Sequence, residues 1–193
     1  MNNEITPEKD PNGQLLKTAI EAALKAGKEI LAIYEDPKAD FQVERKADNS
    51  PLTIADRRSN DIITHLLGST PYPILSEEGR DIAYDERRTW RTLWIVDPLD
   101  GTVEFIKGNN EFTVNIALME NNVCMGAVIY VPYFEKMYIA GRDSGSYLKE
   151  HIAPDAAAPA STRIRALRKV IMKKRKIVPI TVLSGYLGAG KTT

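Results

Sequence analysis

Asp97-Pro98-Leu99-Asp100-Gly101-Thr102 follows a strand-like run, residues 92–96, in a chain of 193 residues. A strand end followed by a tight turn can direct Asp97 and Asp100 at one centre, with the Leu99 carbonyl pointing the same way. Carboxylate and carbonyl oxygens are the hard ligands that Mg²⁺ requires. Two neighbouring Mg²⁺ ions can make a water nucleophilic and neutralise a phosphate dianion, so the stretch predicts a metal-dependent phosphatase site.

Nearby residues add to this site. Gly101 and Thr102 offer backbone N–H groups at an expected helix start, which can seat a phosphate oxyanion. Glu77 and Glu78 follow another strand-like run, residues 74–76, and can supply a carboxylate from a neighbouring strand end. Two acids in a turn are usually a solvated surface feature. The five fixed positions of the hexapeptide, however, recur by chance in a chain this long on the order of once in ten thousand.

The surrounding chain reads as two helices followed by strands. Apolar residues at helical spacing predict amphipathic helices over residues 14–34 and 53–67, the second ending at Gly68. Strand signals then recur at residues 74–76, 92–96, 112–119, 123–131 and 136–140. The pair Asn121-Asn122 between two apolar runs predicts a hairpin turn. This order predicts the α+β class, with two helices packed on an antiparallel sheet.

Two single residues are interpreted as structural. Cys124 lies within an apolar run, so we expect a buried strand thiol, and a single cysteine excludes an intrachain disulfide. His65 has no second His or Cys spaced to join it, so we expect a surface residue and not a metal ligand.

Charge divides the chain into unlike parts. All 26 acidic residues precede residue 156, and the remainder carries basic residues alone, although the net charge is zero. An acidic body repels nucleic acid and attracts divalent cations, so we expect no nucleic-acid partner. No apolar run approaches the ~20 residues that span a bilayer, and residues 1–13 lack the apolar centre of a secretion signal. We therefore expect a cytoplasmic protein without a transmembrane segment, although the basic tail allows peripheral membrane association.

The acidic motifs resemble the inositol-monophosphatase superfamily, and more closely its 3′(2′),5′-bisphosphate nucleotidases. The resemblance rests on Lys46-Ala47-Asp48-Asn49-Ser50-Pro51-Leu52-Thr53-Ile54-Ala55-Asp56, Leu75-Ser76-Glu77-Glu78-Gly79, Trp94 through Thr102, Val103-Glu104-Phe105-Ile106 and Glu111-Phe112-Thr113-Val114-Asn115-Ile116-Ala117-Leu118. It implies lithium-sensitive, Mg²⁺-dependent hydrolysis of adenosine 3′,5′-bisphosphate to AMP, with Mn²⁺ as a substitute ion. It also implies the N-terminal half of an αβαβα sandwich. An inositol-1-monophosphatase-like enzyme is the alternative, although such enzymes typically carry Asn where this chain has Glu104.

The same resemblance implies a role for each matching residue. One metal would be held by Glu77, Asp97 and the Leu99 carbonyl, and a second by Asp97 and Asp100; the family uses two or three ions. The catalytic pair that activates the attacking water would be Asp56 and Thr102. The N–H groups of Gly101 and Thr102 would hold the substrate phosphate, and Glu78 is assigned no role.

The resemblance covers about residues 14–150, the first half of such an enzyme. The family's third metal-binding aspartate follows a later Trp, and neither Trp90 nor Trp94 is followed by Asp. The part that would bind the nucleoside has no counterpart either. We therefore expect an impaired phosphatase for a nucleoside bisphosphate. We also expect self-association, because removing a partner domain would bare apolar surface.

The last part of the chain carries a second motif. Residues 152–160 are rich in Ala and Pro, and residues 163–176 form a basic run that we interpret as a solvated linker helix. A β-type run then leads into a P-loop, whose candidate nucleotide-binding residues are Gly185, Gly188, Gly190, Lys191 and Thr192. Residues 172–193 resemble the start of a CobW-type metallochaperone GTPase. The helix after the loop and a Walker-B aspartate are missing from the sequence, so we do not expect GTP to bind.

These observations predict three segments. They are a truncated Mg²⁺-dependent phosphatase domain over residues 1–150, a linker over residues 151–171 and a P-loop strand fragment over residues 172–193. Two readings of another kind stay open beside the phosphatase: a fragment of a GTP-binding metallochaperone, and a non-catalytic fusion of two truncated reading frames.

Overall fold

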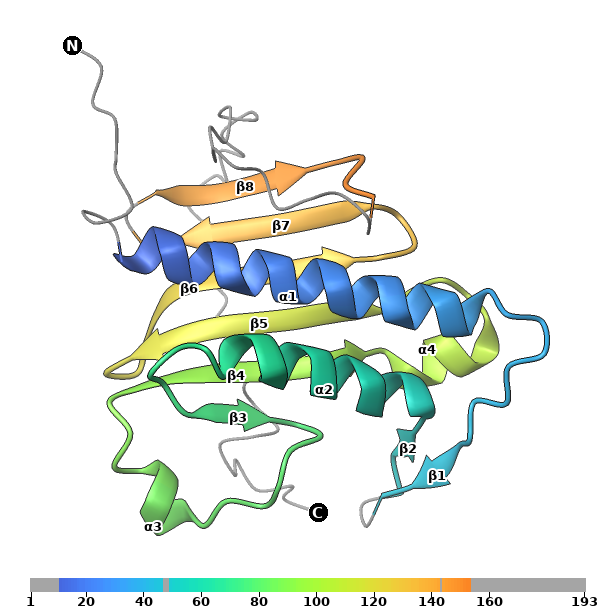
Figure 1. Cartoon of the computed structure of the whole chain (residues 1–193), viewed down its shortest axis with the longest axis horizontal. Helices are drawn as coiled ribbons and strands as arrows, with labels where there is room; N and C mark the ends of the chain where they lie inside the picture. The colour runs from blue at the N-terminus through green and yellow to red at the C-terminus, as the bar shows by residue number, and fades with distance from the viewer. Residues whose placement is uncertain (1–10, 47–48, 143, 154–193) are drawn as a thin grey trace, which may run out of the picture.

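The computed structural model describes residues 11–46, 49–142 and 144–153. They form a six-stranded sheet with two long helices, α1 and α2, lying across one face (Figure 1). The expected linker, basic run, β-type run and P-loop, including Gly185, Gly188, Gly190, Lys191 and Thr192, lie outside the described residues.

The sheet has the strand order β3-β4-β5-β6-β7-β8. The bounds of its strands are Ile74–Ser76 for β3, Thr92–Asp100 for β4, Thr113–Glu120 for β5, Val123–Val131 for β6, Lys136–Gly141 for β7 and Gly145–Lys149 for β8. Strands β4 to β8 form an antiparallel meander, whereas β3 pairs in parallel with β4. The predicted α+β class is therefore confirmed, with one parallel pair that the sequence reading did not include.

The second helix begins where its sequence can satisfy the free N–H groups. Helix α2 spans Ile54–Leu67, and Thr53 caps it: the Thr53 side chain accepts from the backbone N–H of Asp56, while the Asp56 carboxylate accepts from the Thr53 N–H. This reciprocal capping box fixes the first turn of the helix. Gly68 forms the C-terminal cap, as the sequence predicted.

The first helix approaches the sheet closely. Helix α1 spans Pro11–Tyr34 and crosses β5 and β6. Its inner face carries the fully buried small residues Ala22, Ala23 and Ala26. A Cβ atom on Gly27 would lie 2.4 Å from the ring of Tyr130 in β6, so only glycine fits at this contact. Helix α1 thus packs on the centre of the sheet, whereas α2 packs on β3 and β4.

The core between helices and sheet is built by alternate strand residues. On β5, Val114, Ile116 and Leu118 are buried, and on β6 Val128 and Tyr130 are buried. This alternation is the pattern expected of strands with one face against a core. The sheet face under the helices therefore supplies the rigid support on which the strand ends are positioned.

Aromatic rings close the core at the end of the sheet where β4 stops. Phe105 and Phe112 lie with ring centroids 5.4 Å apart, and Tyr34 of α1 lies 4.9 Å from Phe112. Phe105 belongs to the short helix α4, Thr102–Lys107, which begins where the sequence placed a helix start. The rings therefore anchor α4 beside the last residues of β4.

Several short elements were not predicted. They are β1 at Glu44–Arg45, β2 at Pro51–Leu52, α3 at Tyr84–Arg87, and the strand β8. The predicted hairpin turn is confirmed, because Asn121 and Asn122 have φ values of 48° and 62°, the left-handed conformation of a two-residue hairpin.

One expectation about a single residue was wrong. Cys124 lies in strand β6 as expected, but its side chain is exposed. The first two residues of β6 are exposed, and burial begins near Gly126, where Leu16 of α1 packs against the strand. His65 is exposed, as expected. No helix in the described ranges is long and apolar enough to cross a membrane.

Candidate functional site

A register shift at the end of β4 brings two carboxylates to one side of the sheet. Asp97 pairs with Asn115 of β5, and Asp100 pairs with Thr113, so three steps along β4 match two steps along β5. In a regular strand, residues three apart point to opposite faces. The extra residue on β4, as in a β-bulge, instead puts Asp97 and Asp100 on the same face.

The sequence between the two aspartates explains this irregularity. Pro98 has no N–H to donate to the ladder, which is why proline occurs at bulges and not within paired strands. The Pro98 carbonyl accepts a hydrogen bond of 2.7 Å from the buried hydroxyl of Ser59 on α2. This bond ties the irregular segment to the helix. Asp97 and Asp100 therefore stand on a fixed backbone.

The parallel pairing of β3 and β4 brings Glu77 beside Asp97. Ser76 pairs with Val96, and the Glu77 N–H continues the ladder by donating to the Val96 carbonyl over 3.0 Å. Glu77 and Asp97 each follow one member of this residue pair. Because parallel strands run in the same direction, both carboxylates lie at the same end of the sheet. Figure 1 shows both strand ends on the side where α2 begins and α4 lies.

Asp97 is the electrostatic centre of the cluster. Burial, repulsion by Glu77 and Asp100, and a hydrogen bond shared with Glu77 together raise the pKa of Asp97 to about 8. Its Oδ1 atom is buried without a hydrogen-bond partner. A crowded, partly desolvated carboxylate with an unsatisfied oxygen is an arrangement that a bound cation would relieve.

Lys46 currently supplies positive charge to part of this cluster. Its Nζ lies 2.5 Å from Glu78 Oε1 and 3.1 Å from Glu77 Oε1. Burial lowers the pKa of Lys46, but hydrogen bonds and charges of Glu78 and Glu77 outweigh burial and raise it overall. Burial raises the pKa of the Glu78 carboxyl, and this effect outweighs the hydrogen bond and charge of Lys46, which lower it. Glu78, which had no role in the sequence reading, therefore anchors this ammonium group.

Asp56 and Thr102 meet although they belong to different elements. Thr102 Oγ1, at the start of α4, donates to Asp56 Oδ1 over 2.9 Å and lies 3.2 Å from the Leu99 carbonyl. The other carboxylate oxygen of Asp56 accepts from the backbone and side chain of Thr53. Burial raises the pKa of Asp56, and the bonds from Thr53 and Thr102 oppose that rise.

Gly101 allows the chain to turn between the carboxylates and α4. Its φ of +93° lies in the left-handed region, and a Cβ atom there would lie 2.6 Å from the Glu111 carbonyl oxygen. Only glycine satisfies both conditions. This turn lets the first N–H groups of α4, which have no acceptor within the helix, begin immediately after Asp100.

The residues present fit a divalent cation, although they are not yet arranged around one. In the ranges that the structure describes, no three His, Cys, Asp or Glu side chains are gathered as an ion would require. Glu77 is instead paired with Lys46. The donors available are carboxylate and carbonyl oxygens, which suit Mg²⁺ or Mn²⁺ and not a thiol-seeking metal. The unpartnered Oδ1 of Asp97 is the strongest observation for this fit.

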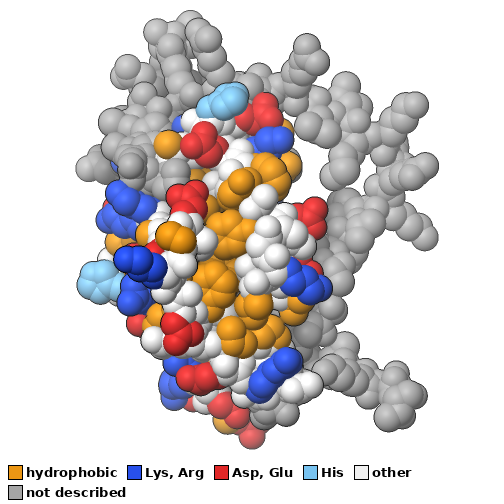
Figure 2. All heavy atoms as spheres, turned by 90° about the vertical axis from the view of Figure 1, so that its right-hand side faces the viewer, with side chains coloured by type: hydrophobic (Ala, Val, Ile, Leu, Met, Phe, Trp, Pro, Cys, Tyr) orange, Lys and Arg blue, Asp and Glu red, His pale blue; other side chains and the backbone are white. Residues whose placement is uncertain are grey.

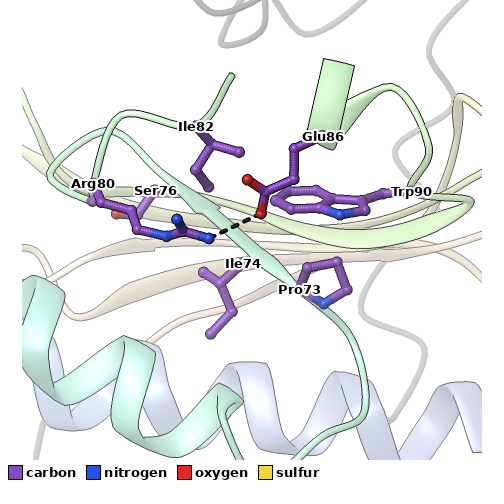
Figure 3. Close-up of a pocket in the computed structure, with 8 residues that line it drawn as sticks. Pro73, Ile74, Ser76, Arg80, Ile82, Glu86 and Trp90 are labelled. Carbon is purple, nitrogen blue, oxygen red and sulfur yellow. Dashed lines mark hydrogen bonds and ion pairs between the residues drawn. The ribbon is translucent and has the colours of Figure 1, made fainter. Parts of the chain in front are cut away.

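A separate pocket of about 380 Å³ lies along the outer edge strand β3. Figure 3 shows Arg80 and Glu86 paired across it, with Trp90 beside Glu86 and Ile74 beneath, and the ion pair measures 2.9 Å. None of the carboxylates assigned to the metals lines this pocket. The hollow is therefore distinct from the acidic cluster.

The sequence reading missed two polar residues at the cluster. Lys46 stood within a quoted motif but received no role. Asn115 donates from Nδ2 to Asp100 Oδ2 over 3.1 Å and is 6% exposed. The sequence did carry a signal for Asn115: a polar amide interrupts the apolar run of β5 at a position opposite Asp97.

Figure 2 looks onto the end of the molecule at which β4 stops and shows a hydrophobic band flanked by acidic and basic side chains.

Comparisons with known proteins agree with this architecture. The sequence pattern of the inositol monophosphatase family matches residues 12–192. The 3′(2′),5′-bisphosphate nucleotidase CysQ of Salmonella typhimurium is 43% identical over 128 residues, which cover 65% of this chain and 51% of that protein. The chain spans about half the length of the curated relatives that it matches.

Solved structures show the same fold. The crystal structure of CysQ from Bacteroides thetaiotaomicron, described as a bacterial member of that family, has a TM-score of 0.64 at 56% identity and covers 72% of this chain and 50% of that one. The suhB protein of Bartonella henselae has a TM-score of 0.62 at 30% identity, covering 70% of this chain and 51% of that one.

Proposed function

The chain belongs to the inositol monophosphatase family, and we propose on that premise that it serves the metal-dependent hydrolysis of a phosphate monoester. The observation that carries the proposal is the pairing of Asp97 with Asn115 and of Asp100 with Thr113, which puts both aspartates on one face. The Oδ1 atom of Asp97, which is buried and has no hydrogen-bond partner, adds an oxygen that can ligate a metal ion on that face.

Divalent ions are the cofactors of this proposal. Glu77, Asp97 and the Leu99 carbonyl would hold one Mg²⁺, and Asp97 with Asp100 would hold another. When bound, such ions supply an activated water and neutralise charge on the phosphate. Glu77 must then exchange its contact with Lys46 for the ion, while Glu78, at 2.5 Å, keeps the ammonium group nearby.

Asp56 and Thr102 orient the attacking water in this proposal. Asp56 accepts the Thr102 hydroxyl hydrogen, which leaves the lone pairs of Thr102 Oγ1 to accept a hydrogen from a water. The capping box holds Asp56 from the other side, so the hydroxyl direction is fixed before substrate arrives. The N–H groups of Gly101 and Thr102, at the turn into α4, would receive the phosphate oxygens.

We propose a nucleoside 3′,5′-bisphosphate as the substrate, with adenosine 3′,5′-bisphosphate converted to AMP and phosphate. Support comes from the CysQ relatives, which carry the name 3′(2′),5′-bisphosphate nucleotidase. An inositol monophosphate is the second candidate, favoured by the match to the inositol monophosphatase family but opposed by Glu104, where inositol phosphatases typically carry Asn.

We expect the 193-residue chain by itself to hydrolyse phosphate esters only slowly. Among the described residues, the second ion has only Asp97 and Asp100, and a nucleoside has no wall assigned to it. The division at residues 150 and 171 and the cytoplasmic location remain proposals. So does the P-loop reading of residues 172–193, and the family match runs through most of that segment.

Self-association also remains a proposal. Its support is the exposure of Tyr133 and Phe134, at 42% and 50%, beside one another in the turn after β6. Such neighbouring exposed rings are typical of contact surfaces.

Phosphate release tests the proposal. We compare two proteins: the 193-residue chain, and a chimera in which residues 1–150 are followed by the C-terminal half of a bisphosphate nucleotidase. Both are assayed with Mg²⁺ on adenosine 3′,5′-bisphosphate and on inositol 1-phosphate. We expect near-background turnover by the first and lithium-inhibited release from the nucleotide by the second. Asp100→Asn abolishes that release, whereas Asp61→Asn, an exposed acid of α2, does not.

Each other outcome changes a definite part of the account. A folded, metal-binding chimera that hydrolyses neither ester contradicts the proposed function. Preference for inositol 1-phosphate selects the second candidate. Vigorous turnover by the 193-residue chain refutes the expected impairment.

A further inference from the structure

We infer that Asn115 is the positioning residue that orients Asp100 toward the second metal ion, and that Thr113 in turn orients Asn115. This inference rests on the proposed function, because it assigns a role at the same site. It concerns two residues of β5 that received no role from the family resemblance.

The contacts form a short directed chain. Thr113 Oγ1 donates to Asn115 Oδ1 over 3.0 Å, and Asn115 Nδ2 donates to Asp100 Oδ2 over 3.1 Å. An amide side chain has one accepting and one donating end. Because the hydroxyl of Thr113 occupies the accepting end, the donating end faces Asp100.

The register explains why β5 can do this. Thr113 and Asn115 are two residues apart and therefore share a face, and they pair with Asp100 and Asp97 across the strands. The shift at Pro98-Leu99 is what brings Asp100 into line with them. The same bulge that gathers the two aspartates thus places the amide between them.

Burial makes the arrangement rigid on one side only. Asn115 is 6% exposed, whereas Asp100 is exposed to solvent. A free carboxylate at a strand end can rotate, and fixing one of its oxygens leaves Oδ1 as the oxygen presented to an ion. Residues that hydrogen-bond a metal ligand typically change metal affinity by about 10- to 100-fold when replaced.

Titration of the full 193-residue chain with Mn²⁺, followed by calorimetry, tests the inference. We expect Asn115→Leu to weaken Mn²⁺ binding about tenfold and Asp100→Asn to do the same. The double variant binds no more weakly than Asp100→Asn alone, because Asn115 acts through Asp100. Asn60→Ala is the matched control and leaves affinity unchanged; it removes from α2 the amide oxygen that accepts a hydrogen bond from the Ser76 hydroxyl of β3.

Thr113 provides a second, milder variant. Thr113→Val leaves the amide of Asn115 free to turn over, so affinity falls by roughly threefold, less than the range for a direct partner. Thr113→Ser keeps the hydroxyl and restores affinity. If Asn115→Leu does not fold, as judged by circular dichroism, this pair decides the question by itself.

Three results overturn the inference. The first is unchanged Mn²⁺ affinity in Asn115→Leu, or in Thr113→Val where that pair decides. The second is an additional loss in the double variant, which a general structural role would produce. The third is a wild-type chain that binds no Mn²⁺, in which case the proposed metal site fails as well; the first two leave that site intact.

Discussion

The Thr102 hydroxyl donates to Asp56 Oδ1 over 2.9 Å, joining the start of α4 to the first turn of α2 across 46 residues of sequence. Asp56 is 1% exposed and depends on such donors, because an unsatisfied buried carboxylate is costly. The contact therefore serves stability as well as the proposed orientation of water.

Thr102→Val removes one of these donors. We expect a loss of about 1–3 kcal/mol in the free energy of unfolding, because Asp56 keeps its burial but loses a partner. Urea denaturation monitored by circular dichroism measures it. Thr102→Ser keeps the hydroxyl and serves as the control; equal losses in both variants would show that the methyl group matters instead of the bond.

Asp97→Asn is expected to stabilise the metal-free protein at alkaline pH. The unfolded chain loses the Asp97 proton near pH 3.9, whereas the folded protein holds it until about pH 8. Between these values the folded state binds more protons, so wild-type stability falls as pH rises. Asp97→Asn has no ionisable carboxyl group at this position, so its free energy of unfolding lacks this decrease with rising pH.

Thermal denaturation with a chelator at pH 5 and pH 8.5 measures the difference. We expect Asp97→Asn to melt a few degrees above wild type at pH 8.5, at roughly 4 °C per kcal/mol, and the gap to narrow at pH 5. The same variant loses Mn²⁺ binding. A gap that widens toward acid pH would contradict the assigned pKa direction.

Lys46→Met is expected to tighten the binding of a divalent ion. The ammonium group competes for Glu77, which it contacts at 3.1 Å. Unit charges about 4 Å apart interact by ~4 kcal/mol at an effective dielectric constant of 20, so a gain of about tenfold in Mn²⁺ affinity is a modest expectation. Lys38→Met, an exposed lysine in the turn after α1, controls for net charge. Weaker binding in Lys46→Met would mean that the lysine assists the ion.

GTP is expected to leave the melting temperature unchanged. A competent nucleotide site would stabilise the fold by mass action at millimolar GTP, and we expect no such site in residues 172–193 of this chain. Differential scanning fluorimetry with and without GTP checks this expectation. A clear shift that Lys191→Ala removes would establish a nucleotide site in the last segment.

The elements with strong periodicity could be read from the sequence, and the relations between them could not. The end of α2 at Gly68, the turn at Asn121-Asn122 and the start of α4 after Gly101 depend on local chemistry and were predicted at or near their observed positions. The exposure of Cys124 depends on where α1 crosses the sheet, which no local pattern specifies.

The candidate site shows the same division. The carboxylates Glu77, Asp97 and Asp100 were singled out because their residue types fit a metal, and the motif carried that information. The bonds of Lys46 to Glu78 and of Asn115 to Asp100 join separate segments, so they depend on how these segments pack and, for Asn115, on the register of β5 with β4.

Anomalous diffraction from crystals of the chain soaked in Mn²⁺ tests the central claim most directly. The account predicts an anomalous peak at the end of β4, about 2.0–2.6 Å from a carboxylate oxygen of Asp97, with Glu77 turned from Lys46 toward the ion. The peak disappears in Asp97→Asn crystals. Well-diffracting crystals that carry no peak at Asp97, or that hold Mn²⁺ only at residues remote from Asp97 and Asp100, would contradict it.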